Sequence, residues 1–328
     1  MKKILLLCLV LTLISALLSA GSVDANVAET VKKDKYVYLI VGFDDAAENT
    51  DVIFTLSFDL SKNIARVAQI PRDTYFNFGA SQNKINQIYA TKRILGESKL
   101  DSMTAMSKAV SQAFGAEFDG FAGISVGTFK KIVDAIGGVD ITLPKEAVIA
   151  IDGEDPLILN KGENHIDGSA AEKFIRYRSG YVRGDLGRID AQKLFLNAMF
   201  AKISDGISVS SMLEIALALK SDIVTDIKIN EILPSMLKTK KSKEEKKTFY
   251  TTVPGEAAFN SAGVSFYVLN RKSAAEVAKD YMFSNKSFDP LGKFCNYSET
   301  EFINIYEDES ISRREFSNES ISDMRISS

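Results

Sequence analysis

The chain has 328 residues, of which 45% are hydrophobic and 25% are charged, as expected for a soluble globular protein with room for one large domain. Its formal net charge is −3, so it has no global basic field to attract nucleic acid, and we expect no nucleic-acid partner. The single histidine, His165, excludes a metal site built from several histidines. A disulfide between the only two cysteines is implausible, because Cys8 lies in an apolar N-terminal run and Cys295 in a polar segment.

The N-terminal segment, residues 1–25, has the features of an export signal. Lys2 and Lys3 precede an uncharged apolar run from Ile4 to Ala20. As a helix this run would span about 25 Å, against a hydrocarbon core of about 30 Å, so a cleaved signal peptide and an uncleaved anchor are both open. The lysines predict a cytoplasmic N-terminus. We therefore expect an extracytoplasmic domain, held at the cytoplasmic membrane by a single anchor or secreted if the signal is cleaved.

Residues 33–283 are predicted to form one α/β domain, because β-branched and aromatic runs alternate with runs of helical spacing. The segment from Pro144 to about Gly162 is expected to be rich in turns, and Ser169 with Glu172 fits a capping box. Residues 284–328 are serine-rich and charged, which predicts a disordered polar tail. Predicted strands cover 36–42, 52–58, 64–70, 121–126, 139–143 and 265–269, and predicted helices cover 101–114, 127–136, 169–176, 187–203 and 273–282, with more helices within 208–238.

Two acidic residues and one arginine are predicted to meet at one end of the sheet. The second and third strands form a hairpin centred near Ser61, which brings Asp51 opposite Pro71 and Arg72. The loop after the first strand carries Asp44 to the same end. Magnesium prefers one or two carboxylates together with phosphate oxygens and water, so this pair could hold it, although exposed acidic residues in loops are common.

The densest polar feature is an arginine cluster in residues 174–192. It contains Arg176, Arg178, Arg183 and Arg188, and the planar fork of each guanidinium matches phosphate oxygens. Gly187 opens a predicted helix whose first amides favour an anion, so the cluster suits a pyrophosphate, and a solvated surface cluster is the alternative. On that helix Arg188 and Gln192 share a face that continues as Phe195 and Met199. This apolar continuation fits a lipid phosphate, or else these two residues are simply core.

A third pattern, Gly123-Ile-Ser125-Val-Gly127, matches the G-x-S-x-G nucleophile elbow between a predicted strand and a predicted helix. His165 follows only forty residues later and no glycine-rich oxyanion segment precedes the elbow. A serine hydrolase is therefore a minor alternative.

The ordered motifs of the chain resemble those of the LytR-CpsA-Psr family, enzymes that transfer polyprenyl-phosphate-linked glycopolymers to the bacterial cell wall. The last motif is the most specific, because its Arg-x-Arg, Gly-Asp-x-Gly-Arg and glutamine keep the family spacing. The matching pieces are VGFD (41–44), TD (50–51), IPRDTYF (70–76), KINQIYA (84–90), FKKIVDAIGGVDITLP (129–144) and RYRSGYVRGDLGRIDAQ (176–192).

The resemblance implies a mixed central β-sheet with helices on both faces and a hydrophobic tunnel for the prenyl chain. It implies that Asp44 and Asp51 hold Mg²⁺ (or Mn²⁺), that Asp73 positions arginines, and that Asp185 orients groups or assists proton transfer. The residues implied to surround the pyrophosphate are Arg72, Lys84, Arg176, Arg178, Arg188 and Gln192. The family usually has an arginine just after the first aspartate and another before the Ser-Asp pair, where this chain has Asp45-Ala46 and Asn49-Thr50. Positive charge near the metal is reduced accordingly.

The function that we expect is a phosphotransferase that moves a glycopolymer from a polyprenyl-pyrophosphate carrier to a sugar hydroxyl of peptidoglycan. The sequence leaves open whether the polymer is teichoic acid, capsule or another polysaccharide. Two alternatives remain. One is hydrolysis of the lipid pyrophosphate at the same site, and the other is a non-catalytic surface protein that binds an anionic lipid or polymer.

Overall fold

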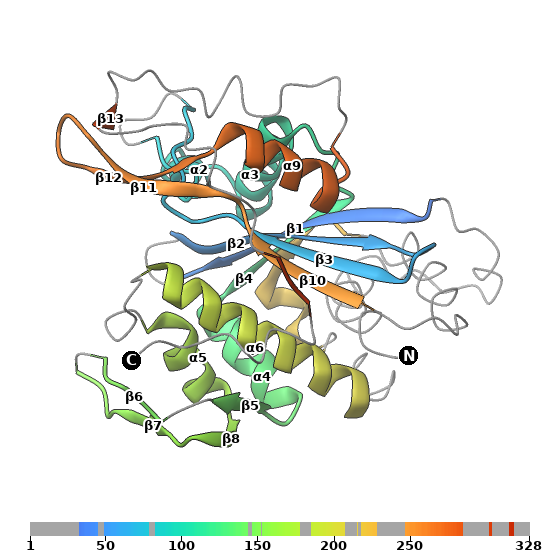
Figure 1. Ribbon diagram of the computed structural model, residues 1–328, viewed down its shortest axis with the longest axis vertical. Helices are drawn as coiled ribbons and strands as arrows, with labels where there is room; N and C mark the ends of the chain where they lie inside the picture. The colour runs from blue at the N-terminus through green and yellow to red at the C-terminus, as the bar shows by residue number, and fades with distance from the viewer. Residues whose placement is uncertain are drawn as a thin grey trace.

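The protein is built around a seven-stranded sheet flanked by helices on both faces, as the computed structural model in Figure 1 shows. The strand order is β14-β10-β3-β2-β1-β4-β9. The sheet is mixed, because β1 pairs with β4 and β3 pairs with β10 in parallel, whereas the other neighbours are antiparallel. The structure describes residues 33–44, 49–78, 83–143, 146–151, 153–177, 185–206, 215, 218–227, 247–284, 302–303 and 315–317.

The strands of the central sheet come from both ends of the domain. Three consecutive strands form its middle, and their expected order and hairpin are confirmed. The strands are β1 (Lys35–Phe43), β2 (Thr50–Asp59), β3 (Ile64–Gln69), β4 (Gly120–Ser125), β9 (Ile223–Thr225), β10 (Lys247–Thr252) and β14 (Glu315–Ser317).

Among the described residues, three helices cover each face of the sheet (Figure 1). One group consists of α2 (Gln87–Ile94), α3 (Lys99–Phe114) and α9 (Arg271–Tyr281). The other consists of α4 (Val126–Ala135), α5 (Gly168–Arg176) and α6 (Asp185–Gly206). A short 3₁₀ helix, η2 (Lys220–Asp222), leads into β9. The α/β fold with helices on both faces of a mixed sheet is therefore confirmed.

The alternation of side chains along β1 explains the two layers. Tyr36, Tyr38 and Ile40 are buried in the core beneath α4, α5 and α6. Leu39 and Val41, on the opposite face, are buried in the core beneath α2, α3 and α9. Both faces of a strand must be apolar when helices cover both, which is why this strand reads as an almost continuous hydrophobic run.

The described residues also form small sheets that are separate from the central sheet. The strand β5 (Val139–Leu143) pairs with β8 (Gly162–Ile166), and β6 (Ala147–Ile149) pairs with β7 (Leu157–Leu159), all below α4 and α5 in Figure 1. The segment after Pro144 therefore contains three short strands as well as the expected turns. A third small sheet contains β11 (Gly255–Asn260), β12 (Ser265–Leu269) and β13 (Phe302–Ile303).

The beginning of α5 differs from the expected capping box at Ser169. The N-cap is Asp167, whose Oδ1 accepts a hydrogen bond of 2.8 Å from the amide of Ala170. Aspartate caps a helix as well as serine does, and starting two residues earlier lets Gly168 pass close to α4. A Cβ atom at Gly168 would lie 2.4 Å from the carbonyl oxygen of Lys130, so only glycine fits there.

Both ends of the chain are described only in part. The N-terminal segment 1–25 lies outside the described residues, and none of the described helices has the length and apolar character needed to cross a membrane. In the segment 284–328, for which we expected a disordered tail, β13 pairs with β11 and β14 pairs with β10. Apart from these two strands and residue 284, that segment lies outside the described residues.

Candidate functional site

Asp44 directly follows β1 and Asp51 lies near the start of β2, so both belong to the same end of two neighbouring strands. Phe43 at the end of β1 pairs with Thr50 at the start of β2, and the amide of Asp44 donates a hydrogen bond of 3.1 Å to the carbonyl oxygen of Asn49. The loop between the two strands, residues 45–48, lies outside the described residues and includes one of the two places where family arginines are missing. Both aspartates therefore lie at the same end of the sheet, as the sequence predicted.

The hairpin register brings Arg72 to Asp51. Phe54 lies opposite Gln69, and continuing this register brings Asp51 level with Arg72. Nη1 of Arg72 forms an ion pair with Oδ1 of Asp51. The predicted convergence of these two residues is confirmed.

Alternating charges continue from this pair along the loop after β3. Nε of Arg72 lies 3.8 Å from Oδ2 of Asp73, and Nζ of Lys84 lies 3.0 Å from Oδ1 of Asp73. The Lys84 side chain is 16% exposed and that of Arg72 is 21% exposed. Partial burial reduces solvent screening, so the two cations are held in place by acidic partners and still reach the surface.

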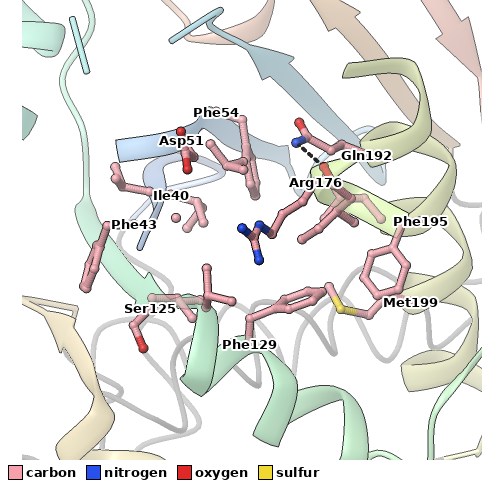
Figure 2. A pocket seen from close by; sticks show the side chains of 17 residues that line it. Ile40, Phe43, Asp51, Phe54, Ser125, Phe129, Arg176, Gln192, Phe195 and Met199 are labelled. Carbon is pink, nitrogen blue, oxygen red and sulfur yellow. Dashed lines mark hydrogen bonds between the residues drawn. The ribbon is translucent and has the colours of Figure 1, made fainter. Parts of the chain in front are cut away.

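Beside this charged row, a mainly apolar pocket lies between the sheet and the helices α4, α5 and α6 (Figure 2). Its empty volume is about 1000 Å³, including the open mouth. Most lining side chains are aliphatic or aromatic, and among them are Phe54, Phe129 and Phe195. The side chains of Asp51, Ser125, Arg176 and Gln192 are its polar exceptions.

Arg176 brings a positive charge into this pocket. In Figure 2 its guanidinium group extends from the end of α5 into the space between Asp51 and Phe129. Nη1 of Arg176 lies 2.6 Å from Oε1 of Glu172, one turn earlier on the same helix. The other oxygen of Glu172 lies 3.0 Å from Nζ of Lys130, and this hydrogen bond, with the negative charge of Glu172, raises the pKa of Lys130. The sequence pattern assigned Glu172 only to a capping box and did not predict its ion pairs with Arg176 and Lys130.

Gln192 is buried next to Arg176 and uses both ends of its amide within the protein. Its Oε1 accepts a hydrogen bond of 2.7 Å from Nε2 of Gln69. Its Nε2 donates a bond of 3.1 Å to the carbonyl oxygen of Ile175. Nothing in the sequence pattern singled out Gln69, because the pairing joins residues 123 positions apart.

Phe195 and Met199 combine the two roles that the sequence left open. Both are buried in the core, and both also line the pocket (Figure 2). The ring of Phe195 lies 5.4 Å from that of Phe129, measured between centroids, and the two rings form part of the pocket wall. The same two side chains therefore pack in the hydrophobic core and line the pocket.

The rest of the arginine cluster lies largely outside the described residues. Arg178 and Arg183 belong to the undescribed stretch 178–184. Asp185 and Arg188 belong to α6, but only their backbone is described. Within the described part of the chain, no three acidic, cysteine or histidine side chains gather into a cation site.

The serine-hydrolase alternative is not supported. Ser125 does lie at a strand-to-helix junction, but its Oγ caps α4 by accepting a hydrogen bond of 3.2 Å from the amide of Thr128. His165 lies on β8, and its Nδ1 is 2.6 Å from Oδ1 of Asp140. Ser125 and His165 form no hydrogen bond with each other and each has another partner, so this geometry does not pair them as nucleophile and base.

The family of the chain follows from a comparison with known proteins. The model of the LytR_cpsA_psr family matches residues 16–282, most of the chain, so the chain belongs to this family. One relative is the polyisoprenyl-teichoic acid--peptidoglycan teichoic acid transferase TagV of Bacillus subtilis (strain 168). It is 26% identical over 217 residues, which are 63% of this chain and 53% of TagV. The chain thus spans about half the length of that relative.

A second relative, the transferase TagU of Bacillus mycoides (strain KBAB4), is 26% identical over 253 residues, which are 74% of this chain and 78% of TagU. The crystal structure of B. subtilis TagV matches with a TM-score of 0.62 and 22% identity, over 77% of this chain and 99% of that one. The structure of TagT bound to LIIa-WTA matches with a TM-score of 0.58 and 20% identity, over 85% of this chain and 96% of that one. These structures share the fold of this chain.

Proposed function

We propose that the protein is a phosphotransferase that moves a glycopolymer from a polyprenyl-pyrophosphate carrier to a sugar hydroxyl of peptidoglycan. One observation carries this proposal. A mainly apolar pocket, suited to a prenyl chain, also exposes Asp51 and Arg176, and Asp51 is paired with Arg72. An apolar cavity that ends in one guanidinium group, with a second paired to the carboxylate in its lining, is complementary to a lipid carrying a pyrophosphate. The names of the relatives TagV and TagU, which are teichoic acid transferases, agree with it.

In the proposed complex the prenyl chain occupies the pocket and packs against the rings of Phe129 and Phe195. Burying apolar surface contributes about 25 cal/mol per Å², so the tail supplies much of the binding free energy. The pyrophosphate then lies among the cations, with Arg72, Lys84 and Arg176 as described contributors. We include Arg178 and Arg188 on the strength of the family motif alone, and Asp73 as the acidic residue that holds Arg72 and Lys84 in place.

These cations act where charge develops during the reaction. The acceptor hydroxyl attacks the phosphorus on the glycan side, loses its proton, and displaces polyprenyl phosphate as the bridging P–O bond breaks. Negative charge on the phosphoryl oxygens is then neutralised by guanidinium groups already in position, which lowers the barrier without reorganisation. Asp185, which begins α6, is proposed to orient groups or to assist removal of the hydroxyl proton.

We propose Asp44 and Asp51 as the ligands of Mg²⁺ (or Mn²⁺). Two carboxylates at one end of the sheet, beside a phosphate site, are the donor set that these hard cations prefer. Only Oδ1 of Asp51 pairs with Arg72, so Oδ2 remains for a cation. When bound, the metal would neutralise charge on the pyrophosphate.

The direct test is transfer of a labelled glycan. The full-length protein is incubated in detergent with a polyprenyl-pyrophosphoryl glycan and peptidoglycan fragments, and the products are identified by mass. Label on the fragment together with polyprenyl monophosphate is the expected result. Free phosphorylated glycan would indicate hydrolysis instead. Lipid binding without any product, in the presence of each metal tested, would contradict the proposal and indicate a non-catalytic binding protein.

We also propose that the domain works on the outer face of the cytoplasmic membrane, because the apolar N-terminal run has its lysines on the cytoplasmic side. Protease added to intact cells would then digest the domain. Protection of the domain until the membrane is opened would contradict this location.

A further inference from the structure

A buried pair of glutamines joins the wall of the pocket, where Gln192 lies, to Gln69, which does not line the pocket. Gln69, at the end of β3, is 2% exposed, and Gln192, in α6, is 6% exposed. Nε2 of Gln69 lies 2.7 Å from Oε1 of Gln192, a short hydrogen bond between two neutral amides. Phe54 lies opposite Gln69 in the hairpin, so the pair is set in an apolar core.

The direction of this hydrogen bond is fixed by a third residue. The carbonyl oxygen of Ile175 can only accept, so Gln192 must turn its Nε2 toward it, at 3.1 Å. The Oε1 of Gln192 then faces Gln69, which must present its own NH₂ group. Gln69 keeps this orientation although its Oε1 has no hydrogen-bond partner among the described residues. A flipped Gln69 would set two carbonyl oxygens against each other.

These two hydrogen bonds join Gln69, Gln192 and Ile175, which belong to the three segments of the chain that carry arginines of the candidate site. Gln69 ends β3 three residues before Arg72, and Ile175 directly precedes Arg176 at the end of α5. Gln192 follows Arg188 by one turn of α6. The two hydrogen bonds therefore connect the backbone segments from which these arginines extend.

We propose that Gln69 is a positioning residue that sets the spacing of the pyrophosphate-binding arginines through Gln192 and the carbonyl group of Ile175. The inference rests on the proposed function and deepens it. Gln69 is not among the residues that line the pocket, so it acts through its partner and not by contact with the lipid. Misplacing a catalytic group by about 1 Å can cost about 10²-fold in rate, whereas binding of the prenyl chain in the pocket depends on other residues.

Two variants of Gln69 separate positioning from bulk packing. Gln69→Met keeps the length of the side chain and removes the donor. Gln69→Glu keeps the shape, and its carboxyl group can donate to Gln192 only while protonated. Tyr250→Phe is the matched control, because it removes another side-chain hydrogen bond to α6, the partly buried 3.3 Å contact between Oη of Tyr250 and Oδ1 of Asn197. Asn197, the residue of α6 in the control bond, follows Gln192 by five positions.

The experiment measures kcat and KM of the full-length protein for release of polyprenyl monophosphate from a polyprenyl-pyrophosphoryl sugar. We expect Gln69→Met to lower kcat by about 10-fold or more with KM changed by less than about 3-fold. The kcat of Gln69→Glu relative to wild type should fall as the pH rises, because deprotonation removes the donor. Tyr250→Phe should keep the wild-type kcat. The affinity for inorganic pyrophosphate, measured by calorimetry, should drop in both Gln69 variants only.

The outcomes distinguish the two proposals. If wild type turns over the lipid and binds pyrophosphate, and both Gln69 variants behave like Tyr250→Phe, the positioning role is wrong and the proposed function stands. If wild type neither releases polyprenyl monophosphate nor binds pyrophosphate, the proposed function fails and the positioning role falls with it. Should Gln69→Glu fail to fold, the kcat and pyrophosphate affinity of Gln69→Met still decide the matter.

Discussion

Replacing Arg176 by alanine tests the charged end of the pocket. Arg176→Ala removes a guanidinium group that is half exposed and whose one described partner is Glu172, at 2.6 Å. An exposed pair at this helical spacing contributes only about 0.3–0.5 kcal/mol to stability. The variant should therefore fold normally, with a melting temperature lowered by about 2 °C or less.

The effect of Arg176→Ala on activity should be much larger. A charge-assisted hydrogen bond to a phosphate oxygen is worth about 1.5–3 kcal/mol, which corresponds to about a 10- to 150-fold loss in kcat/KM. The assay is release of polyprenyl monophosphate from a polyprenyl-pyrophosphoryl sugar, followed by mass, alongside a thermal melt of the same preparation.

Lys131→Ala is the matched control for Arg176→Ala. Lys131 is also an exposed cation paired with one carboxylate, since its Nζ lies 2.6 Å from Oδ2 of Asp222, but it does not line the pocket. We expect its kcat/KM to stay within about 2-fold of wild type, because surface ion pairs contribute little. Equal losses in the two variants, or no loss in Arg176→Ala, would refute the assignment of Arg176 to the substrate.

Three further predictions concern the pocket, the pH dependence and the packing. Leu196→Trp fills part of the apolar pocket and should raise KM about 10-fold for a long-chain lipid but not for a short-chain analogue, as steady-state kinetics on both would reveal. Burial alone would raise the pKa of Asp59, but hydrogen bonds led by that from Ser61 lower it below its ordinary value of 3.8, so its stabilising effect is present above that value and is lost as the pH falls below it. Asp59→Asn should thus lower the free energy of unfolding by about 1–2 kcal/mol at pH 7, with the difference shrinking as the pH falls below 3.8 in urea titrations. Gly168→Ala should cost about 1–3 kcal/mol by the same method, because the added methyl group meets the carbonyl oxygen of Lys130 at 2.4 Å.

The strand hairpin could be predicted from the sequence to the level of single contacts. Its side chains alternate with a period of two, so the position of the turn fixes which residues lie opposite each other. Centring the turn near Ser61 was enough to bring Asp51 to Arg72, and the ion pair between them follows. The predicted end of a helix at residue 136 also agrees with the structure, because α4 ends at Ala135 and is followed by Gly137 and Gly138 with φ of 76° and 73°, a conformation that few other residues adopt.

Features that depend on distant packing could not be read from the sequence. The strand β10 follows a lysine-rich run and joins the sheet in parallel with β3, a pairing that no local pattern specifies. The bond between Gln69 and Gln192 exists only because α6 packs across the end of β3. The pocket likewise arises from the spacing between α6 and the sheet, since Phe195 and Met199 would look the same in a solid core.

The most direct test of the account is metal-dependent cleavage of the lipid substrate. The full-length protein is incubated in detergent with a polyprenyl-pyrophosphoryl sugar, with Mg²⁺ or with a chelator, and polyprenyl monophosphate is quantified by mass. We predict release that requires the metal and is lost in Asp51→Asn, because Asp51 is a proposed ligand of the cation and also pairs with Arg72. Lipid that binds but is never cleaved, with or without Mg²⁺, would contradict a phosphotransferase and leave a binding protein with the same fold.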